Sequence, residues 1–253
     1  MTSGTLAQQD ERRAYANLDI SVRRQKGRKI AALLAARTTI KGARLLDIGA
    51  GSGAIADFFR TQGCKVSAID REDNILPGLD IDFRAVPGVD LPFPDNAFDI
   101  VVYNHVIEHV GDATAQLRHL DEINRVLSDG GYLYLSVPNR WSIIEPHYKL
   151  AFLSWLPNGL ASLYARLSGR HSWYDCRPLS RREAADFMRK AGFAIEDVTD
   201  EALSLYIRNE MKDGVKKRIA QLVERMPFLF LGTIPTLVFL GKVKKTDARP
   251  LLQ

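Results

Sequence analysis

The chain has 253 residues, of which 46% are hydrophobic and 26% are charged, and its formal net charge at pH 7 is +5. This balance is typical of a soluble globular protein and excludes a disordered, collagen-like or disulfide-stapled chain. The positive charge is small and dispersed, so no nucleic-acid partner is expected. The two cysteines, Cys64 and Cys176, form no pattern at zinc-ligand spacing, so no metal is expected.

The N-terminal residues are polar and lack the apolar run of a secretory signal. The most apolar window, residues 226–240, is interrupted by Pro227, Gly232 and Pro235 and is shorter than the roughly 20 residues that a spanning helix needs. We therefore expect a cytoplasmic protein, with one domain over residues 1–253.

The first half of the chain alternates predicted helices and strands. Helical composition runs through residues 11–37, and further helices are predicted at residues 54–61 and 113–127. Strands are predicted at residues 43–49, 65–70, 82–86, 98–103 and 131–137. This alternation predicts an α/β, Rossmann-like fold, in which helices cover both faces of a mostly parallel sheet.

The pattern changes after Pro138. Residues 139–178 hold all three tryptophans and no clear strand, which predicts a mainly helical insertion that caps the substrate site. A surface hairpin of helices over the sheet edge is the alternative. Ser180 and Glu183 are spaced as a capping box, which predicts a helix that ends before Gly192. A strand at residues 193–198, a helix at 212–225 and a strand at 236–240 complete the prediction.

A glycine-rich loop, residues 49–53, joins the first predicted strand to the helix that follows, and Asp70 ends the next strand. Glycines let a ligand approach the backbone, and the spacing also fits a dinucleotide site, which keeps an NAD(P)-dependent oxidoreductase as an alternative. Asp47, two residues before the loop, would repel a pyrophosphate and attract a cation. A sulfonium and an α-amino group are both cationic, so the predicted ligand is S-adenosylmethionine.

Three segments carry a resemblance to a known family: residues 45–53, the pair Ile69-Asp70, and residues 90–101 with Asn104, Glu108 and His109 after them. Together they resemble the class I S-adenosylmethionine-dependent methyltransferases, in the group that includes the ubiquinone and menaquinone methyltransferases. The resemblance covers residues 43–138. It implies a seven-stranded sheet whose last strand is antiparallel.

The resemblance also implies a set of cofactor-binding residues. Asp47 would lie near the amino group, and Asp70 would accept hydrogen bonds from both ribose hydroxyls. Pro87 stands where many relatives carry an adenine-binding Asp, so the adenine contact is expected from backbone groups instead, with Val89 or Asp90 as the named candidates. The rest of the predicted set is Gly49, Ala50, Gly51, Gly53, Arg71, Leu91 and Asn104.

The acceptor side is predicted from position and polarity. His105 and His109 follow a strand at the edge where ligands of open α/β sheets bind, so they are expected to face the methyl group. A hydroxyl or acidic-carbon acceptor needs a general base, and the candidates are His109, His105 and His147, although a single histidine is more often structural. The residues predicted to contact the acceptor are Glu145, His147, His171, Tyr174 and Arg177.

An apolar stretch runs over residues 150–167, with Lys149, Arg166 and Arg170 as basic residues around it. It fits packing on the core, binding of a greasy substrate, or peripheral contact with a membrane. We expect methyl transfer to an O, N or C atom of a small-molecule acceptor, lipid-like or lipid-linked. A non-catalytic, cofactor-binding partner protein is the alternative from another class. The acceptor's identity and the oligomeric state stay open.

Overall fold

Seven strands form one sheet in the computed structural model, which describes residues 20–169, 173–211, 214, 220 and 234–244. The spatial order is β3-β2-β1-β4-β5-β7-β6, and β7 runs antiparallel to both of its neighbours. This topology confirms the predicted sheet and its antiparallel last strand. The strands are β1 Arg44–Ile48, β2 Lys65–Asp70, β3 Asp82–Ala85, β4 Phe98–Asn104, β5 Leu127–Pro138, β6 Phe193–Asp197 and β7 Thr236–Val243.

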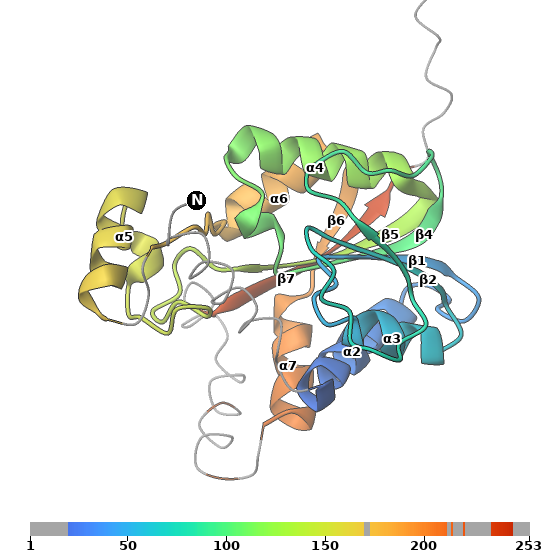
Figure 1. Ribbon diagram of the computed structural model, residues 1–253, viewed down its shortest axis with the longest axis horizontal. Coiled ribbons are helices and arrows are strands. Elements are labelled where there is room, and N and C mark those ends of the chain that lie inside the picture. The colour runs from blue at the N-terminus through green and yellow to red at the C-terminus, as the bar shows by residue number, and fades with distance from the viewer. Residues whose placement is uncertain (1–19, 170–172, 212–213, 215–219, 221–233, 245–253) are drawn as a thin grey trace, which may run out of the picture.

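Helices cover both faces of the sheet (Figure 1). One face carries α2 (Ile20–Ala35), α3 (Ala54–Thr61) and α7 (Thr199–Asn209), and the other carries α4 (Ala113–Val126) and α6 (Arg181–Lys190). Each face has its own apolar core, because strands buried on both sides supply apolar side chains in both directions. The capping box predicted at Ser180 and Glu183 is present at the start of α6.

Helix α7 is the main element that the sequence pattern did not predict. The pattern placed the late helix at residues 212–225, most of which lie outside the described residues, as do residues 11–19 of the first predicted helix. Helix α7 begins at Thr199, whose hydroxyl accepts a hydrogen bond from the Val238 amide of β7 at 3.0 Å. That contact joins residues far apart in the sequence, and local spacing carries no signal of it.

The insertion between β5 and α6 is only partly helical, which corrects the expectation of a mainly helical segment. Its described residues, 139–169 and 173–178, contain the helix α5 (Asn158–Leu167) and the short 3₁₀ turn η2 (Leu153–Trp155). The rest is irregular, and its backbone makes non-helical hydrogen bonds, such as those from the amides of Glu145 to Leu150 and of Phe152 to Ile143. A separate apolar cluster that includes Tyr148, Leu153 and Cys176 holds the segment together. Figure 1 shows α5 projecting beyond the end of the sheet.

No helix within the described ranges has both the length and the apolar content needed to cross a membrane.

Candidate functional site

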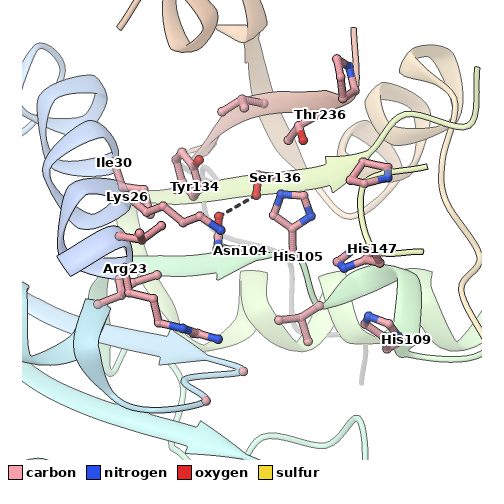
Figure 2. A pocket seen from close by; sticks show the side chains of 18 of the residues that line it. Arg23, Lys26, Ile30, Asn104, His105, His109, Tyr134, Ser136, His147 and Thr236 are labelled. Carbon is pink, nitrogen blue, oxygen red and sulfur yellow. Dashed lines mark hydrogen bonds between the residues drawn. The ribbon is translucent and has the colours of Figure 1, made fainter. Parts of the chain in front are cut away.

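A cavity of about 790 Å³ opens where β1, β2 and β4 end. Its walls come from the glycine loop, from α2, from α7 and from the insertion. Asn104 closes β4 at the cavity wall, and its Oδ1 accepts a hydrogen bond of 2.8 Å from Ser136 of the neighbouring strand (Figure 2). The predicted position at the carboxyl edge of the sheet is therefore where a large cavity lies.

The glycine loop is shaped so that only glycine fits at two of its positions. Gly49 has a φ of +73°, and a Cβ there would lie 2.3 Å from a methyl group of Val106. Gly53, with a φ of +76°, would place a Cβ 2.9 Å from Ile75. The backbone of Gly49 and Gly51 lines the cavity, while Ala50 and Gly53 are buried beneath its surface. A ligand can therefore approach the loop backbone closely, beside the N-terminus of α3.

Asp47 lies under the loop, 2% exposed, and its Oδ2 has no hydrogen-bond partner within the described residues. Burial raises the pKa of Asp47 to about 7, against the opposing effect of the positive charge on Arg23. An under-compensated buried carboxylate fits a cationic ligand.

Asp70 presents a second carboxylate to the same cavity. Its two oxygens accept hydrogen bonds from the backbone amides of Arg71, at 2.7 Å, and Gly51, at 2.8 Å. These bonds fix the carboxylate at the cavity wall, and each oxygen keeps lone pairs that can accept a ligand hydroxyl. The acidic groups and the glycine cradle fit S-adenosylmethionine.

The Asp47→Asn substitution is expected to change how stability depends on pH. Because the pKa of Asp47 is raised in the folded chain, the wild type loses stability as the pH rises from about 4 to about 7, by up to about 4 kcal/mol. The Asn variant lacks this loss of stability, so at pH 8 it is expected to unfold at a higher urea concentration than the wild type. Urea titrations at pH 4 and pH 8, with the surface variant Asp82→Asn as control, measure the effect. The prediction is contradicted if the free energy of unfolding changes with pH by the same amount in Asp47→Asn as in the wild type.

Helix α2 adds two cations to the cavity that the sequence analysis did not assign. Arg23 lies beside the loop, with Nη1 3.0 Å from the position of a Cβ on Gly51, and interacts with the charges of Asp47 and Asp70. Lys26 reaches the cavity one turn further on (Figure 2). Burial, and then the nearby charge of Arg23, lowers the pKa of Lys26. The sequence does carry a sign of this placement. Arg23 and Lys26 precede the buried Ile30 at helical spacing, which places all three on the inward face of the helix.

Three histidines meet at the other end of the cavity. The ring centroids of His105 and His109 lie 5.4 Å and 5.6 Å from that of His147 (Figure 2). His105 follows Asn104 at the end of β4, and His109 is the last residue of the 3₁₀ turn η1 (Ile107–His109). His105 has a φ of +57°, a strained conformation that is common at functional sites. The insertion supplies His147, so the fold brings together all three predicted bases.

Glu108 lies under these rings and is fully buried. Its Oε1 is 3.1 Å from Nε2 of His147 and 3.4 Å from Nδ1 of His105. Burial alone would raise the pKa of Glu108, but the adjacent His105 ring and the hydrogen bond from His147 hold it well below its ordinary value. Burial also lowers the pKa of His105. The cluster is thus an ionised carboxylate that orients imidazole rings at the cavity wall.

Two further residues predicted to bind the cofactor, Asp90 and Leu91, are not among the residues that line the cavity. Asp90 is exposed and pairs with Arg118 at 2.8 Å. Leu91 is buried in the core, and its amide donates to Glu122 at 2.9 Å. The apolar residues of this segment, Leu91 and Phe93, belong to the core on one face of the sheet. Arg71, in contrast, lines the cavity.

Three residues predicted to contact the acceptor also lie outside the cavity lining. Glu145 is fully buried and accepts a hydrogen bond from the Tyr148 amide. Arg177 binds Gln116 at 2.6 Å and Glu183 at 3.2 Å, so it ties the end of the insertion to α4 and α6. Tyr174 is buried within the insertion. His171 lies outside the described residues. These side chains stabilise the insertion from within.

Comparisons with known proteins agree with this geometry. The model of a family described as "Methyltransferase domain" matches residues 18–198. The ubiquinone biosynthesis O-methyltransferase of Xanthomonas axonopodis pv. citri is 32% identical over 178 residues, which cover 66% of this chain and 69% of that protein. The protein of the same name from Cereibacter sphaeroides is 30% identical over 174 residues, 63% of each chain.

Solved structures share the fold. The 1,6-didemethyltoxoflavin-N1-methyltransferase of Burkholderia thailandensis superposes with a TM-score of 0.56 at 19% identity, covering 94% of this chain and 84% of that one. A putative methyltransferase of Haloferax volcanii, solved with the activator Trm112, has a TM-score of 0.56 at 20% identity, over 92% and 97%. With the family match over most of the sequence, the chain belongs to the methyltransferase domain family and is an S-adenosylmethionine-dependent methyltransferase of a small-molecule acceptor.

Proposed function

We propose that this enzyme methylates a hydroxyl oxygen of a lipid-linked acceptor. The observation that carries the proposal is the bond between buried Glu108 and His147 at the cavity wall. A hydroxyl must lose its proton as it accepts a methyl group, whereas an amine needs only to arrive unprotonated. An oriented histidine at the acceptor end therefore favours oxygen. The relatives named ubiquinone biosynthesis O-methyltransferase support the same choice.

We assign the cofactor to the end of the cavity formed by the glycine loop. S-adenosylmethionine, when bound, supplies the methyl group on its sulfonium. In this assignment Asp47 attracts the cationic part, Asp70 accepts hydrogen bonds from the ribose, and Arg23 pairs with the carboxylate. The remaining contacts are assigned to Gly49, Gly51, Arg71 and Asn104, which line the cavity.

We assign the acceptor to the end formed by His105, His109 and His147. His147 takes the proton of the acceptor hydroxyl, and Glu108 holds the ring and stabilises the positive charge that the ring gains. The insertion, residues 139–178, acts as the substrate cap, because it supplies His147, Tyr148 and Trp173 to the cavity wall. Closing the cavity excludes water and positions the hydroxyl for in-line attack.

Transfer of a labelled methyl group tests the choice of acceptor. Two matched acceptors share one isoprenoid tail, and one carries a catechol while the other carries an aromatic amine. A third, a catechol without a tail, measures the effect of the lipid. We expect the tailed catechol to give a methyl ether with the highest kcat/KM. Transfer confined to the amine would contradict the proposal.

We also propose that the insertion rests on a membrane surface, which would give a cytoplasmic enzyme access to a lipid-linked acceptor. A group of exposed apolar side chains, here called the apolar cap face, lies on the insertion. Trp155 contacts Trp141 and Phe152 ring to ring, at 5.9 Å and 5.0 Å between centroids, and α5 packs against η2. The members are Trp141, Ile143, Ile144, Phe152, Trp155, Leu160, Leu163 and Leu167, each 46–78% exposed except Trp155 at 42%.

Charge near the apolar cap face fits the same partner. Arg140 lies over the ring of Trp141 at 5.8 Å, and Lys149 and Arg166 belong to the same insertion. Each basic residue near an anionic surface contributes about 1 kcal/mol of attraction. Packing of residues 150–167 against residues 226–231 is the alternative that the sequence leaves open. That segment lies outside the described residues.

Vesicle co-sedimentation checks the membrane proposal. The wild type is expected to pellet with vesicles that contain anionic lipid, and to pellet less as salt rises, because the basic residues are screened. Leu163→Glu and Trp155→Glu place a charge on the apolar cap face and are expected to abolish pelleting. Ile20→Glu, at a side chain that is 45% exposed on α2, is the matched control. Pelleting that persists in both cap variants, with unchanged thermal stability, would contradict membrane contact.

A further inference from the structure

A second cluster of side chains borders the acceptor end of the cavity and has no role so far. It joins His109 of η1 to Asp175 and Cys176 at the end of the insertion. Three distances, each 3.8 Å, link Nδ1 of His109 to Sγ of Cys176, Sγ to Oδ1 of Asp175, and Nδ1 to Oδ2 of Asp175. The nitrogen-to-oxygen distance is too long for a hydrogen bond.

These distances resemble the edges of a coordination polyhedron. Imidazole, carboxylate and thiolate ligands bound tetrahedrally to one Zn²⁺ lie about 3.3–3.6 Å from one another, given zinc–ligand bonds of about 2.0–2.3 Å. With a single oxygen of Asp175 as the ligand, the three ligand atoms lie within 4.8 Å of one another, and a closing shift of up to about 1 Å would bring them to that spacing. The contacts of Glu108 differ, because Nε2 of His147 lies 3.1 Å from its Oε1, within hydrogen-bonding distance.

The surroundings of the cluster also favour a cation. The carboxylates of Glu108 and Glu145 interact electrostatically with Cys176, and both are fully buried. One oxygen of each carboxylate has no hydrogen-bond partner within the described residues. The hydroxyl of Tyr174, 6% exposed and close to Cys176 and Asp175, has none either among those residues. Such a concentration of buried acceptors is costly unless a positive ligand joins it.

We propose that His109, Asp175 and Cys176 bind a Zn²⁺ ion whose fourth position opens to the cavity. Soft thiolate together with imidazole and carboxylate is a donor set of zinc, and three protein ligands with one open position are typical of catalytic zinc sites. His109 and Asp175 line the cavity, so the open position faces the acceptor. The amide of Arg177 donates to the carbonyl of Glu108 at 2.8 Å, which holds the end of the insertion against η1.

A zinc ion at this site would let residues of the insertion take part in activating the acceptor. An acceptor oxygen bound at the open position would lie beside His147, whose ring centroid is 5.6 Å from that of His109. Zinc would lower the pKa of that hydroxyl, and His147 would take its proton. This role of the insertion rests on the proposed function, whereas zinc binding itself does not. Sequence spacing gave no sign of the site, because 67 positions separate His109 from Cys176.

Metal titration of the whole chain tests the proposal. The protein is stripped with a chelator and loaded with Zn²⁺, or with Co²⁺ as a spectroscopic probe. We expect one ion per chain, and for Co²⁺ a thiolate charge-transfer band with the strong visible absorption of a tetrahedral site. Cys176→Ser should remove the band, and Cys176→Ser and Asp175→Asn should each weaken Zn²⁺ binding by more than about 100-fold, since even outer-shell substitutions cost 10- to 100-fold.

Two controls make the result specific. Cys64→Ser removes the other buried cysteine and should leave metal binding unchanged. S-adenosylhomocysteine binding, measured on every variant, shows that the variant is folded and that the cofactor site is intact. Failure of wild-type uptake, a Co²⁺ spectrum without a thiolate band, or unchanged Zn²⁺ affinity in Cys176→Ser would overturn the zinc site. None of these results would touch the methyl-transfer proposal, which is tested by labelled transfer.

Discussion

Replacing His147 by alanine is expected to reduce kcat by about 10²- to 10⁴-fold, the contribution of a general base, and to leave cofactor affinity unchanged. The reason is position. His147 lies at the acceptor end of the cavity, held by Glu108, whereas the glycine loop and Asp70 form the other end. The measurement is kcat for methyl transfer beside the dissociation constant of S-adenosylhomocysteine.

Two further variants separate catalysis from folding. Glu108→Gln keeps the shape of the side chain but removes the charge that stabilises the protonated ring, so kcat should fall without loss of cofactor binding. His119→Gln is the matched control, because His119 is buried against Tyr103 outside the cavity lining, with 2.7 Å from its Nδ1 to the tyrosine hydroxyl. Full activity in His147→Ala would show that His147 is not the general base.

Replacing Asp70 by alanine is expected to weaken S-adenosylmethionine binding by about 1.5–3 kcal/mol, which is roughly 10- to 150-fold. The carboxylate is fixed by the amides of Gly51 and Arg71, and its remaining lone pairs face the cavity. The variant therefore loses hydrogen bonds to the ribose and also a restraint on the loop. Calorimetric titration measures the loss.

Asp82→Ala is the control for that titration. Asp82 begins the adjacent strand β3 and accepts a hydrogen bond from Ser67 at 2.8 Å, outside the cavity lining. The affinity of the Asp82→Ala variant for S-adenosylmethionine should equal that of the wild type. An Asp70→Ala protein that binds the cofactor as tightly as the wild type would place the ribose elsewhere.

The sheet was predictable because its strands carry local signals. The predicted ends of β2 and α3 match the structure, since an apolar run or a helical period is bounded there by a glycine or an aspartate. The insertion gave no such signal. Its irregular backbone is held by backbone bonds outside regular elements, such as that from the Arg177 amide to Glu108, and by side chains such as Arg177, which binds Gln116 of α4. Contacts of this kind have no periodicity along the chain.

The cofactor end of the site was predicted better than the acceptor end for the same reason. Asp47, Gly49 and Asp70 belong to one strand–loop–helix–strand unit, so short spacing places them together. Arg23 reaches the loop only because α2 docks on the sheet. Glu145 and Tyr174 carry polar groups that predicted a substrate contact, yet both are buried within the insertion. Polarity alone does not distinguish a side chain that faces a ligand from one that satisfies its own segment.

Calorimetric titration of the wild type with S-adenosylmethionine, S-adenosylhomocysteine and NAD tests the central claim most directly. The buried carboxylate of Asp47 beneath the loop and the fixed carboxylate of Asp70 match a cationic, ribose-bearing ligand and disfavour a pyrophosphate. We predict micromolar binding of the first two ligands and no binding of NAD. Tight binding of NAD with no heat from S-adenosylmethionine would contradict the account.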